Sequence, residues 1–485
     1  MNKNLKKIVE LFFVMAVSLS MCVSCGGSDD ILKDDDDGPS PSIDEEVDDE
    51  FETNPNEEID EDGAVKIVFD AQSVIVTNPY EGKGVLITQS GADVVVKSTL
   101  SDEISYILSG STTEGSLKIY SETKFELKMN GVSIVNSNDP ALNIQSGKKV
   151  TITLVDGTSN RLAGGTMFVS EGGDEDMKAA FFSEGQLVFD GTGSLVVISR
   201  YRHAICSDDY IRIDGGNIVV SVAAQDGIHA KDYIEINSGT ININSIGDGI
   251  DSEGDVTING GTIVIKASGE EAEGLECEMN MTINGGDIEI EASDDCINAS
   301  NAIVINGGSI YCYSATNDGI DSNGTLTITG GTVVAVGSAS PEEGFDCDHN
   351  TFKITGGILI GIGGTTSTPT ANACTQYSLV YSGNAISQNS SFNITSSEGK
   401  NVLTYVVPKS LNNITILFSN PELENGSTYT ISKGGSVTGG TNFHNLYSGA
   451  TYSGGSLLST FTISSMVTTI GGSSGGNQGG PGGRP

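Results

Sequence analysis

A short turn that ends in glycine recurs through the middle of this chain at nearly constant spacing. Consecutive turns are 23, 22, 25, 22, 23 and 26 residues apart, and their last glycines are Gly216, Gly239, Gly261, Gly286, Gly308, Gly331 and Gly357. A sequence period of about 20 to 50 residues is typical of a solenoid, in which each repeat forms one coil and buries its inner face against its neighbours. The repeat therefore favours stacked coils over a fold with one central core.

Residues on both sides of each turn alternate between apolar and mostly polar. Around Gly261, for example, Val256 and Ile258 precede the turn with Thr257 between them, and Ile263 follows it. A period of two is that of a β-strand with one buried face. Leucine-rich repeats would carry a leucine ladder, and propeller blades would be about twice as long. We therefore predict an all-β protein built on a right-handed parallel β-helix.

The same cadence continues beyond the seven turns. Two upstream stretches, residues 141–157 and 181–199, keep the order of strand, turn and strand, so we expect the β-helix to cover residues 64–364. Residues 365–470 still alternate but lack the glycine period, which indicates a small C-terminal β module. A module of this kind is needed to cover the last coil, because a bare terminal coil exposes unpaired backbone groups and apolar core.

Both ends of the chain differ in composition from the repeat. Residues 1–25 combine a basic start with an apolar run too short to span a membrane, a pattern typical of a lipoprotein signal peptide. We expect lipidation at Cys25, with Cys22 or ordinary secretion as alternatives, and anchoring at a bacterial outer membrane or cell surface. The acidic residues 26–63 and the glycine-rich residues 471–485 are predicted to be a disordered tether and tail.

The chain is strongly acidic, with 64 Asp and Glu against 24 Lys and Arg and a formal net charge of -40. Nucleic-acid binding is excluded on this basis, because phosphate backbones are held by Lys and Arg. Divalent cations, or partners bridged by them, suit such a chain better. We expect a monomer that contacts the membrane only through its lipid.

In register, the repeats superimpose seven four-residue stretches whose third residue is apolar and points inward. The first and fourth residues then form two rows at the surface, which we call the first and second carboxylate ladders. The first ladder contains Asp226, Asp248, Glu273, Asp295, Asp318 and Glu343. The second ladder contains Asp251, Glu276, Asn298, Asp321 and Asp346.

Carboxylates stacked in this way repel one another. Coils of a parallel solenoid are about 4.8 Å apart, where like charges cost about 1 kcal/mol in water and more when shielded from it. Because Ca²⁺ prefers carboxylate and amide oxygens, we predict that the eleven ladder residues are Ca²⁺ ligands. The alternative is solvated turns, since Asp and Gly are common there. Two upstream coils favour the metal, because they carry "AAFF" and "PALN" at the same place.

Two histidines stand at the start of the ladders. His203, Cys206, Asp226 and His229 fall on adjacent coils and could hold a transition metal. No tight metal-binding spacing supports such a site, so we favour a buried thiol beside ordinary histidines. The remaining cysteines of the repeat region show no pairing pattern and are interpreted as small apolar residues of the coil walls: Cys277, Cys296, Cys312, Cys347 and Cys374.

The stretches "NGVSIVNS", "VTITLVDGTSN" and "DGTGSLVV", with the DGI and GGT turns of residues 226–357, resemble the extracellular lipoproteins known as carbohydrate-binding domain-containing proteins. The resemblance implies a right-handed parallel β-helix that holds calcium and binds cellulose and acidic sugars such as polygalacturonate. The chain departs from the pattern at "HAIC", "DGIH" and "DCIN", where ladder acids are missing. The number of metal sites therefore stays open.

Three functions compete at this point. The first is a surface-anchored, noncatalytic protein that binds polysaccharide with calcium, using aromatic platforms from Tyr201, Tyr210, Tyr233, Tyr311 or Tyr313. The second is a pectate-lyase-like polysaccharide lyase, which needs a base near the metal. Its base would come from Arg200, Arg202, Arg212, Lys231 or Lys266, of which Arg202 and Lys231 lie closest to the ladders in sequence. The third is a structural adhesin.

Overall fold

The computed structural model describes residues 63–169 and 175–471, and all of them belong to one compact unit, Asp60–Pro485. The predicted leader with Cys22 and Cys25, the acidic residues up to 62 and the tail from residue 472 lie outside the described residues. The described residues form strands, turns and loops, and they contain no helix. It follows that none of their segments is a helix able to cross a membrane.

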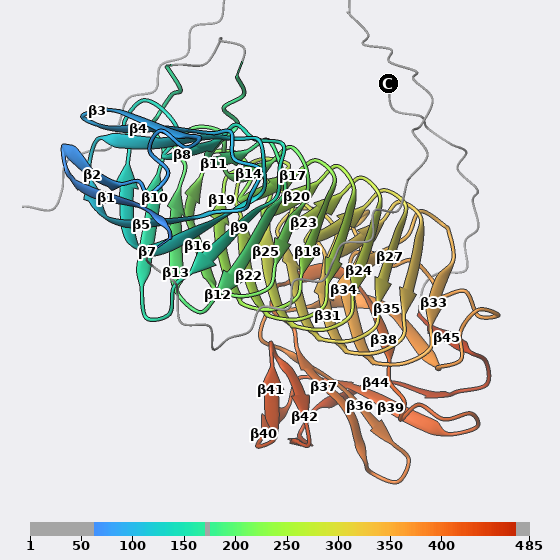
Figure 1. The fold of residues 1–485 in the computed structure, drawn as a ribbon. Helices are drawn as coiled ribbons and strands as arrows, with labels where there is room; N and C mark the ends of the chain where they lie inside the picture. Colours follow the sequence, from blue (N-terminus) through green and yellow to red (C-terminus); the bar gives the residue numbers. More distant parts are fainter. Residues whose placement is uncertain (1–62, 170–174, 472–485) are drawn as a thin grey trace, which may run out of the picture. The chain divides into compact units, whose positions relative to one another are not determined.

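The described chain winds into a parallel β-helix with three strands per coil (Figure 1). One strand of each coil belongs to a twelve-stranded sheet that carries the carboxylate ladders, which we call the ladder sheet. Its strands are β3 (Val85–Ser90), β4 (Ala92–Ser98), β6 (Gly115–Ser121), β8 (Leu142–Ile144), β11 (Ala179–Ser183), β14 (His203–Ser207), β17 (Ile228–Ala230), β20 (Ile250–Ser252), β23 (Leu275–Cys277), β26 (Ile297–Ala299), β29 (Ile320–Ser322) and β32 (Phe345–Asp346).

The other two strands of each coil form two columns of a larger sheet, and the glycine turn lies between them. The middle column contains β9 (Val150–Leu154), β12 (Leu187–Gly191), β15 (Ile211–Ile213), β18 (Tyr233–Ile236), β21 (Asp255–Ile258), β24 (Asn280–Ile283), β27 (Ala302–Ile305), β30 (Thr325–Ile328) and β33 (Phe352–Ile354). The third column contains β10 (Ser159–Ala163), β13 (Ser194–Ile198), β16 (Asn217–Ala223), β19 (Thr240–Ser245), β22 (Thr262–Ala267), β25 (Asp287–Ala292), β28 (Ser309–Ser314), β31 (Thr332–Val336) and β34 (Ile358–Gly363). The all-β parallel β-helix predicted from the repeat is confirmed.

The first coils are simpler than the rest. Their long strands β1 (Val65–Ala71), β5 (Ser105–Thr112) and β7 (Phe125–Val135) pair in parallel, and β7 then pairs with both β9 and β10. Two antiparallel pairs stand at this end, where β2 (Ser73–Thr77) joins β1 and β3 joins β4. These hairpins were not predicted. Each hairpin adds an antiparallel strand beside the first parallel strand of its sheet, so β1 and β4 are not left as unpaired edge strands.

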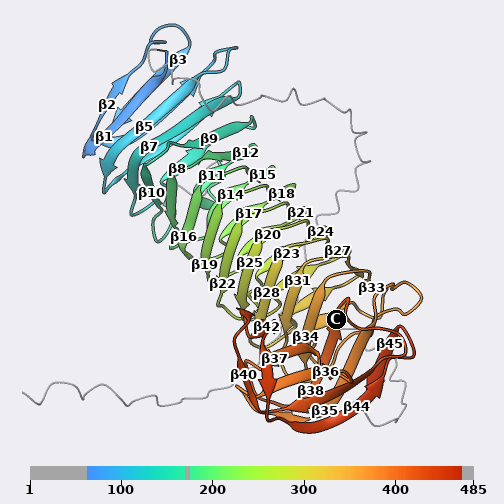
Figure 2. The same cartoon turned by 90° about the horizontal axis from the view of Figure 1, so that it is seen from below.

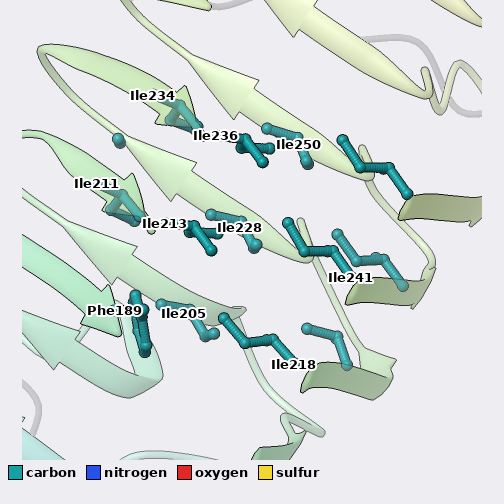
Figure 3. Packing of buried hydrophobic residues seen from close by; sticks show 14 of the residues in the cluster. Phe189, Ile205, Ile211, Ile213, Ile218, Ile228, Ile234, Ile236, Ile241 and Ile250 are labelled. Atoms are coloured by element: carbon teal, nitrogen blue, oxygen red, sulfur yellow. The ribbon is translucent and has the colours of Figure 1, made fainter. Parts of the chain in front are cut away.

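Apolar side chains of successive coils stack directly on one another in the interior. Ile205 pairs with Ile228 and Ile228 with Ile250, and all three are fully buried. Figure 3 shows this row beside those of Ile211 and Ile234 and of Ile213 and Ile236. The alternation seen in the sequence thus becomes continuous rows of contacts along the solenoid, which is the main source of its stability.

Glycine is required where the chain turns between the middle and third columns. The seven turn glycines have φ between +87° and +102°, which lies outside the range that L side chains favour. Their spacing therefore reports the number of residues in each coil. The six described cysteines are all buried and unpaired, as the sequence predicted for the walls of the coils.

The C-terminal module is antiparallel and continues the large sheet. Its β38 (Leu411–Ser419) pairs with β34 of the last coil, and β35 (Ser378–Ile386) and β45 (Val467–Ile470) extend the sheet. A second sheet packs beyond them and contains β36 (Ser391–Ser396), β37 (Asn401–Val406), β39 (Thr428–Lys433), β41 (Thr441–Phe443), β42 (Leu446–Ser448) and β44 (Ser456–Thr462). A two-stranded ribbon is formed by β40 (Ser436–Thr438) and β43 (Thr451–Ser453).

This module does more than close the last coil. It shares a second apolar core with the outer face of the third column, where Val334 and Ile360 are buried under module residues such as Phe392 and Phe418. Figure 2 shows the module, in orange and red, lying along the end of the solenoid. The outward residues of β28, β31 and β34 that this core covers are accordingly Tyr311, Val334, Val336, Ile360 and Ile362.

Replacing Ile250 with Ala should destabilise the protein by about 2 to 5 kcal/mol, because it leaves a cavity in a row where each side chain contacts the coils on both sides. Asn242→Ala, an exposed change on a neighbouring strand, should stay within about 0.5 kcal/mol. Urea unfolding of both variants measures the difference. Equal shifts for the two would contradict the row as the stabilising element.

Candidate metal-binding site

The ladders exist in the register expected from the sequence. His229 pairs with Asp251, and Asp251 with Glu276, on strands β17, β20 and β23. The row continues through Asn298 and Asp321 to Asp346. The two acid-free upstream coils align at the same place, since β11 pairs with β14 and β8 with β11. The chain therefore forms the same strand at this place whether or not the coil carries ladder acids.

The second residue of each stretch is small because other coils crowd it. A Cβ on Gly249 would lie 2.3 Å from Ile265 Cγ2 and 2.5 Å from the carbonyl oxygen of Gly274. Cys296 is the exception among the ladder coils, and its thiol donates to the carbonyl oxygen of Ile290 at 3.7 Å. Close packing at this residue fixes the directions of the ladder side chains on either side of it.

The first ladder uses one oxygen of each aspartate to hold the next coil. The backbone N–H of Asp248 donates to Asp226 Oδ1 at 2.9 Å, and that of Glu273 donates to Asp248 Oδ1 at 2.7 Å. The N–H of Asp318 donates to Asp295 Oδ1 at 2.7 Å in the same way. These side chains are more buried than surface turns would be, with Asp295 only 3% exposed, because each folds back over the neighbouring backbone.

Other ladder oxygens have no such partner. Glu273 Oε2, Asp321 Oδ1 and Glu343 Oε2 are buried and accept no hydrogen bond from the described residues. A buried, unpaired carboxylate oxygen is strongly unfavourable unless a cation or a proton satisfies it. These atoms point to a positively charged group that the side chains do not provide.

Ladder acids gather into two clusters. In each one, an oxygen of every member lies within 4.8 Å of the others: Asp226, Asp248 and Asp251 form the first, and Asp318, Asp321 and Asp346 the second. Between the clusters Asn298 takes the place of an acid, and its amide donates to Glu273 Oε1 at 2.9 Å. Glu276 and Asp295 belong to neither three-membered cluster among the described residues. The structure therefore brings six of the eleven predicted ligands together.

Burial raises the pKa of most ladder carboxyl groups, and repulsion from neighbouring carboxylates adds to the effect. The pKa rises to about 9 for Glu273 and Asp295, to about 8 for Asp248 and Asp318, and to about 7 for Asp321 and Glu343. All six values lie above the ordinary range of a carboxyl group. Without a cation, Glu273, Asp295, Asp248 and Asp318 therefore stay protonated at neutral pH, and a bound cation would favour their charged forms.

This donor set fits Ca²⁺. The ion takes six to eight oxygen ligands in flexible geometry, and carboxylates are its preferred donors. The second cluster offers three carboxylates, and Asp321 contributes the unpartnered Oδ1. Asp346 is held in place by the hydroxyl of Ser367, which donates to its Oδ1 at 2.7 Å. Asp321 and Asp346 are half-buried, so one side of the cluster faces solvent.

At the histidine end of the ladders, Cys206 is the buried thiol that the sequence favoured. Cys206 packs with Ala179 and Phe182 in a small separate apolar cluster. His203, Asp226 and His229 do lie together, and Asp251 joins them through a 2.7 Å hydrogen bond to His229 Nδ1. Asp251 was not grouped with the histidines from the sequence, although the predicted ladder register places it over His229. Although burial acts to raise the pKa of Asp226, His203 holds that pKa below its ordinary value.

The aromatic candidates have different environments. Tyr311 is buried under the C-terminal module and stacks on His444, with ring centroids 4.0 Å apart, so it is not a surface platform. Lys409 of the module covers Tyr313 at 4.8 Å, and Tyr201 meets Phe168 edge-on. Tyr210, which directly precedes β15, and Tyr233, the first residue of β18, form a stacked pair with ring centroids 4.7 Å apart. Tyr233 is 37% exposed and adjoins the coil that carries His229.

Comparison with known proteins identifies relatives of this chain. Residues 81–344 match a family described as carbohydrate-binding domain-containing protein. A protein of that name from Acetivibrio thermocellus is 29% identical over 162 residues, which is 32% of this chain and 52% of the relative. The chain thus spans about half the length of this curated relative. A solved structure of a polysaccharide lyase-like protein from C. thermocellum, a gadolinium derivative, is 25% identical with a TM-score of 0.43 and covers 59% of this chain and 99% of that chain.

The raised pKa values predict how stability depends on pH once divalent cations are removed. In the unfolded chain these carboxyl groups lose their protons near pH 4, whereas in the folded protein they keep them to between about pH 7 and pH 9. Across this window the folded state binds more protons, so the free energy of unfolding falls as the pH rises. We expect the Tm measured in chelator to decrease from about pH 5 to about pH 9.

Saturating Ca²⁺ should flatten this dependence, because the ion stabilises the charged carboxylates. Parallel thermal melts in Ca²⁺ and in chelator, at each pH, separate the two contributions. A Tm in chelator that stays constant or increases across the window would show that the ladder carboxylates are already compensated within the protein.

Replacing Asp318 and Asp321 together with Asn should reduce the number of Ca²⁺ ions bound and lower the Tm in Ca²⁺ but not in chelator. An asparagine oxygen can still accept the backbone N–H that Asp318 holds, so the fold should be retained. Asp287→Asn, an exposed change on the third column, is the matched control. Calorimetric Ca²⁺ titration reports the stoichiometry, and an unchanged value in the double variant would exclude the second cluster as a site.

Proposed function

The chain belongs to the carbohydrate-binding domain-containing proteins, and from that membership we propose that it is a noncatalytic, surface-anchored protein that binds acidic polysaccharides through Ca²⁺. The observation that carries the proposal is the set of buried ladder oxygens without hydrogen-bond partners, at Glu273, Asp321 and Glu343. They mark a strip of the coil edge that needs cations.

Calcium would link the acidic protein to an acidic ligand. A formal net charge of -40 repels a polyanion such as polygalacturonate unless cations intervene. The second cluster offers three carboxylates to an ion that takes six to eight oxygens, so several positions remain for water or a uronate carboxylate. Asp321 and Asp346 open toward solvent, which gives a ligand access to that side of the ion.

A neutral polymer such as cellulose would bind differently. Sugar rings pack against aromatic faces, and the Tyr210 and Tyr233 pair is the exposed aromatic feature beside the start of the ladders. Hydroxyl groups of the polymer would then bond to polar side chains nearby. This contact uses no carboxylate, so it should not depend on calcium.

The proposal of a noncatalytic protein follows from the positions of the basic residues. Lyase chemistry requires a base close to the metal-bound uronate. Arg212 pairs with Asp214 at 3.0 Å and Lys266 with Glu291 at 3.1 Å, both on columns other than the ladder sheet. Lys231 and Arg202 flank the histidine end, several coils away from the second cluster. Anchoring at the cell surface rests on the leader sequence and Cys25.

We expect the chain to bind polygalacturonate in the presence of Ca²⁺ and to lose that binding when chelator is added. Binding of cellulose should be unchanged by chelator. The Asp318→Asn, Asp321→Asn variant should weaken binding of polygalacturonate alone. Tyr233→Ala should weaken binding of cellulose by about 2- to 10-fold, since one aromatic face contributes about 0.5 to 1.5 kcal/mol. Pull-down and calorimetric titration against both polymers provide the measurement.

Two other results would support a different function for this protein. Polygalacturonate binding that survives complete calcium removal, or no binding to either polymer in Ca²⁺, would leave a structural adhesin as the better description. Growth of the ultraviolet absorbance of unsaturated uronates, lost on changing Arg202 or Lys231, would establish a lyase instead.

A further inference from the structure

The first coils of the ladders carry nitrogen donors in place of acids. By the register of β14 and β17, His203 occupies a first-ladder position, and His229 occupies a second-ladder position. Their imidazole rings are stacked, with centroids 4.7 Å apart and planes 20° from parallel. Each side chain is 16% exposed. Two imidazoles and two carboxylates, Asp226 and Asp251, therefore share one enclosed end of the strip.

The donor atoms have the spacing of a metal coordination shell. His203 Nδ1 lies 2.8 Å from Asp226 Oδ2, and His229 Nδ1 lies 3.8 Å from the same oxygen. His229 Nδ1 is also 2.7 Å from Asp251 Oδ2. In a tetrahedral site with bonds of about 2.0 to 2.2 Å, neighbouring donors are about 3.4 Å apart. The observed distances fall on both sides of that value. The donors of His203, Asp226 and His229 lie within 4.8 Å of one another, whereas Asp251 adjoins this group through His229.

Hydrogen bonds within the protein satisfy His229 Nδ1, which is 2.7 Å from Asp251 Oδ2, but not the facing nitrogen of His203. His203 Nδ1 is buried and makes no well-formed hydrogen bond, although the carboxylate oxygen is close to it. A cation shared by His203 and Asp226 would satisfy that ring nitrogen and the carboxylate oxygen together.

The surroundings hold these donors in position. The second oxygen of Asp226, Oδ1, accepts the backbone N–H of Asp248 at 2.9 Å, which fixes the carboxylate. Glu253 Oε1 lies 3.9 Å from His229 Nε2, the ring nitrogen that faces away from the donors. Carboxylates commonly support metal-bound imidazoles from that side.

We propose that His203, His229, Asp226 and Asp251 form a binding site for a first-row divalent transition metal such as Zn²⁺. Imidazole nitrogen suits Zn²⁺, whereas Ca²⁺ selects oxygen donors, so this end of the strip differs in specificity from the second cluster. The donors of His203, Asp226 and His229 lie within 4.8 Å of one another, and Asp251, which contacts His229, would supply the fourth donor of a tetrahedral, structural site. It joins the coils of β14, β17 and β20. The inference does not depend on carbohydrate binding.

The test uses the full chain, stripped of metals and returned to excess Ca²⁺, with Co²⁺ as the spectroscopic probe. One equivalent of Co²⁺ should bind with the visible absorption of a tetrahedral site, and Zn²⁺ should displace it. His203→Ala and His229→Ala should each weaken binding by more than about 100-fold, because losing a ligand costs more than the roughly 10- to 100-fold effect of losing a supporting partner. His349→Ala, an exposed histidine near the other end of the ladders, should bind as the wild type does.

A second variant keeps the test independent of any loss of folding. His229→Asp recreates the "DGID" stretch that the chain already uses at Asp248 and Asp318, so the coil should form. It should lose the Co²⁺ absorption and bind one more Ca²⁺. Unchanged Co²⁺ affinity in both alanine variants, or displacement of Co²⁺ by equimolar Ca²⁺, would overturn the site and leave the histidines as counterions. Since no readout involves a sugar, its failure is separate from failure of the proposed function.

Discussion

In-register stacking of parallel coils is the constraint on which the rest of this structure depends. Backbone hydrogen bonds hold each coil about 4.8 Å from the next, and the constant repeat places equivalent residues over one another. For Ile205, Ile228 and Ile250 the outcome is favourable, because each buries its neighbour. For Asp318, Asp321 and Asp346 the same stacking concentrates negative charge. One geometric rule thus supplies both the stability of the core and the electrostatic strain of the ladders.

The ladders divide their oxygens between two tasks. One oxygen of Asp226, Asp248 or Asp295 accepts the N–H of the following coil, so the acids contribute to the fold itself. The remaining oxygens crowd together, and burial raises the pKa of most of these groups. The partners of the ladder carboxylates differ along the strip. The amide of Asn298 donates a hydrogen bond to Glu273 in the middle, and imidazoles lie beside Asp226 at the start. The end of the strip retains the oxygen-rich cluster that suits Ca²⁺.

The C-terminal module shows how the solenoid ends without exposing its edges. Strand β38 pairs with β34, and the second core covers the outer face of β31 and β34. This arrangement withdraws Tyr311 from the surface and places the exposed Tyr233 far along the solenoid from the module. Access to the ladders remains, because the module packs on the third column and the ladders lie on another sheet. Capping and ligand binding therefore use different faces of the coils.

Periodicity in the sequence was enough to predict the strands, the parallel stacking and the alignment of "DGID" with "EGLE", because side chains that repeat every coil must superimpose if the core rows are to pack. It also predicted apolar roles for Cys277 and Cys296, since both stand at inward or crowded places. Only the tertiary structure decided that Asp226 faces two histidines while Cys206 turns away, that Asn298 bridges to Glu273, and that the module covers Tyr311. These outcomes depend on side-chain directions across coils and on packing between segments distant in sequence, and neither is encoded in the local pattern of apolar and polar residues.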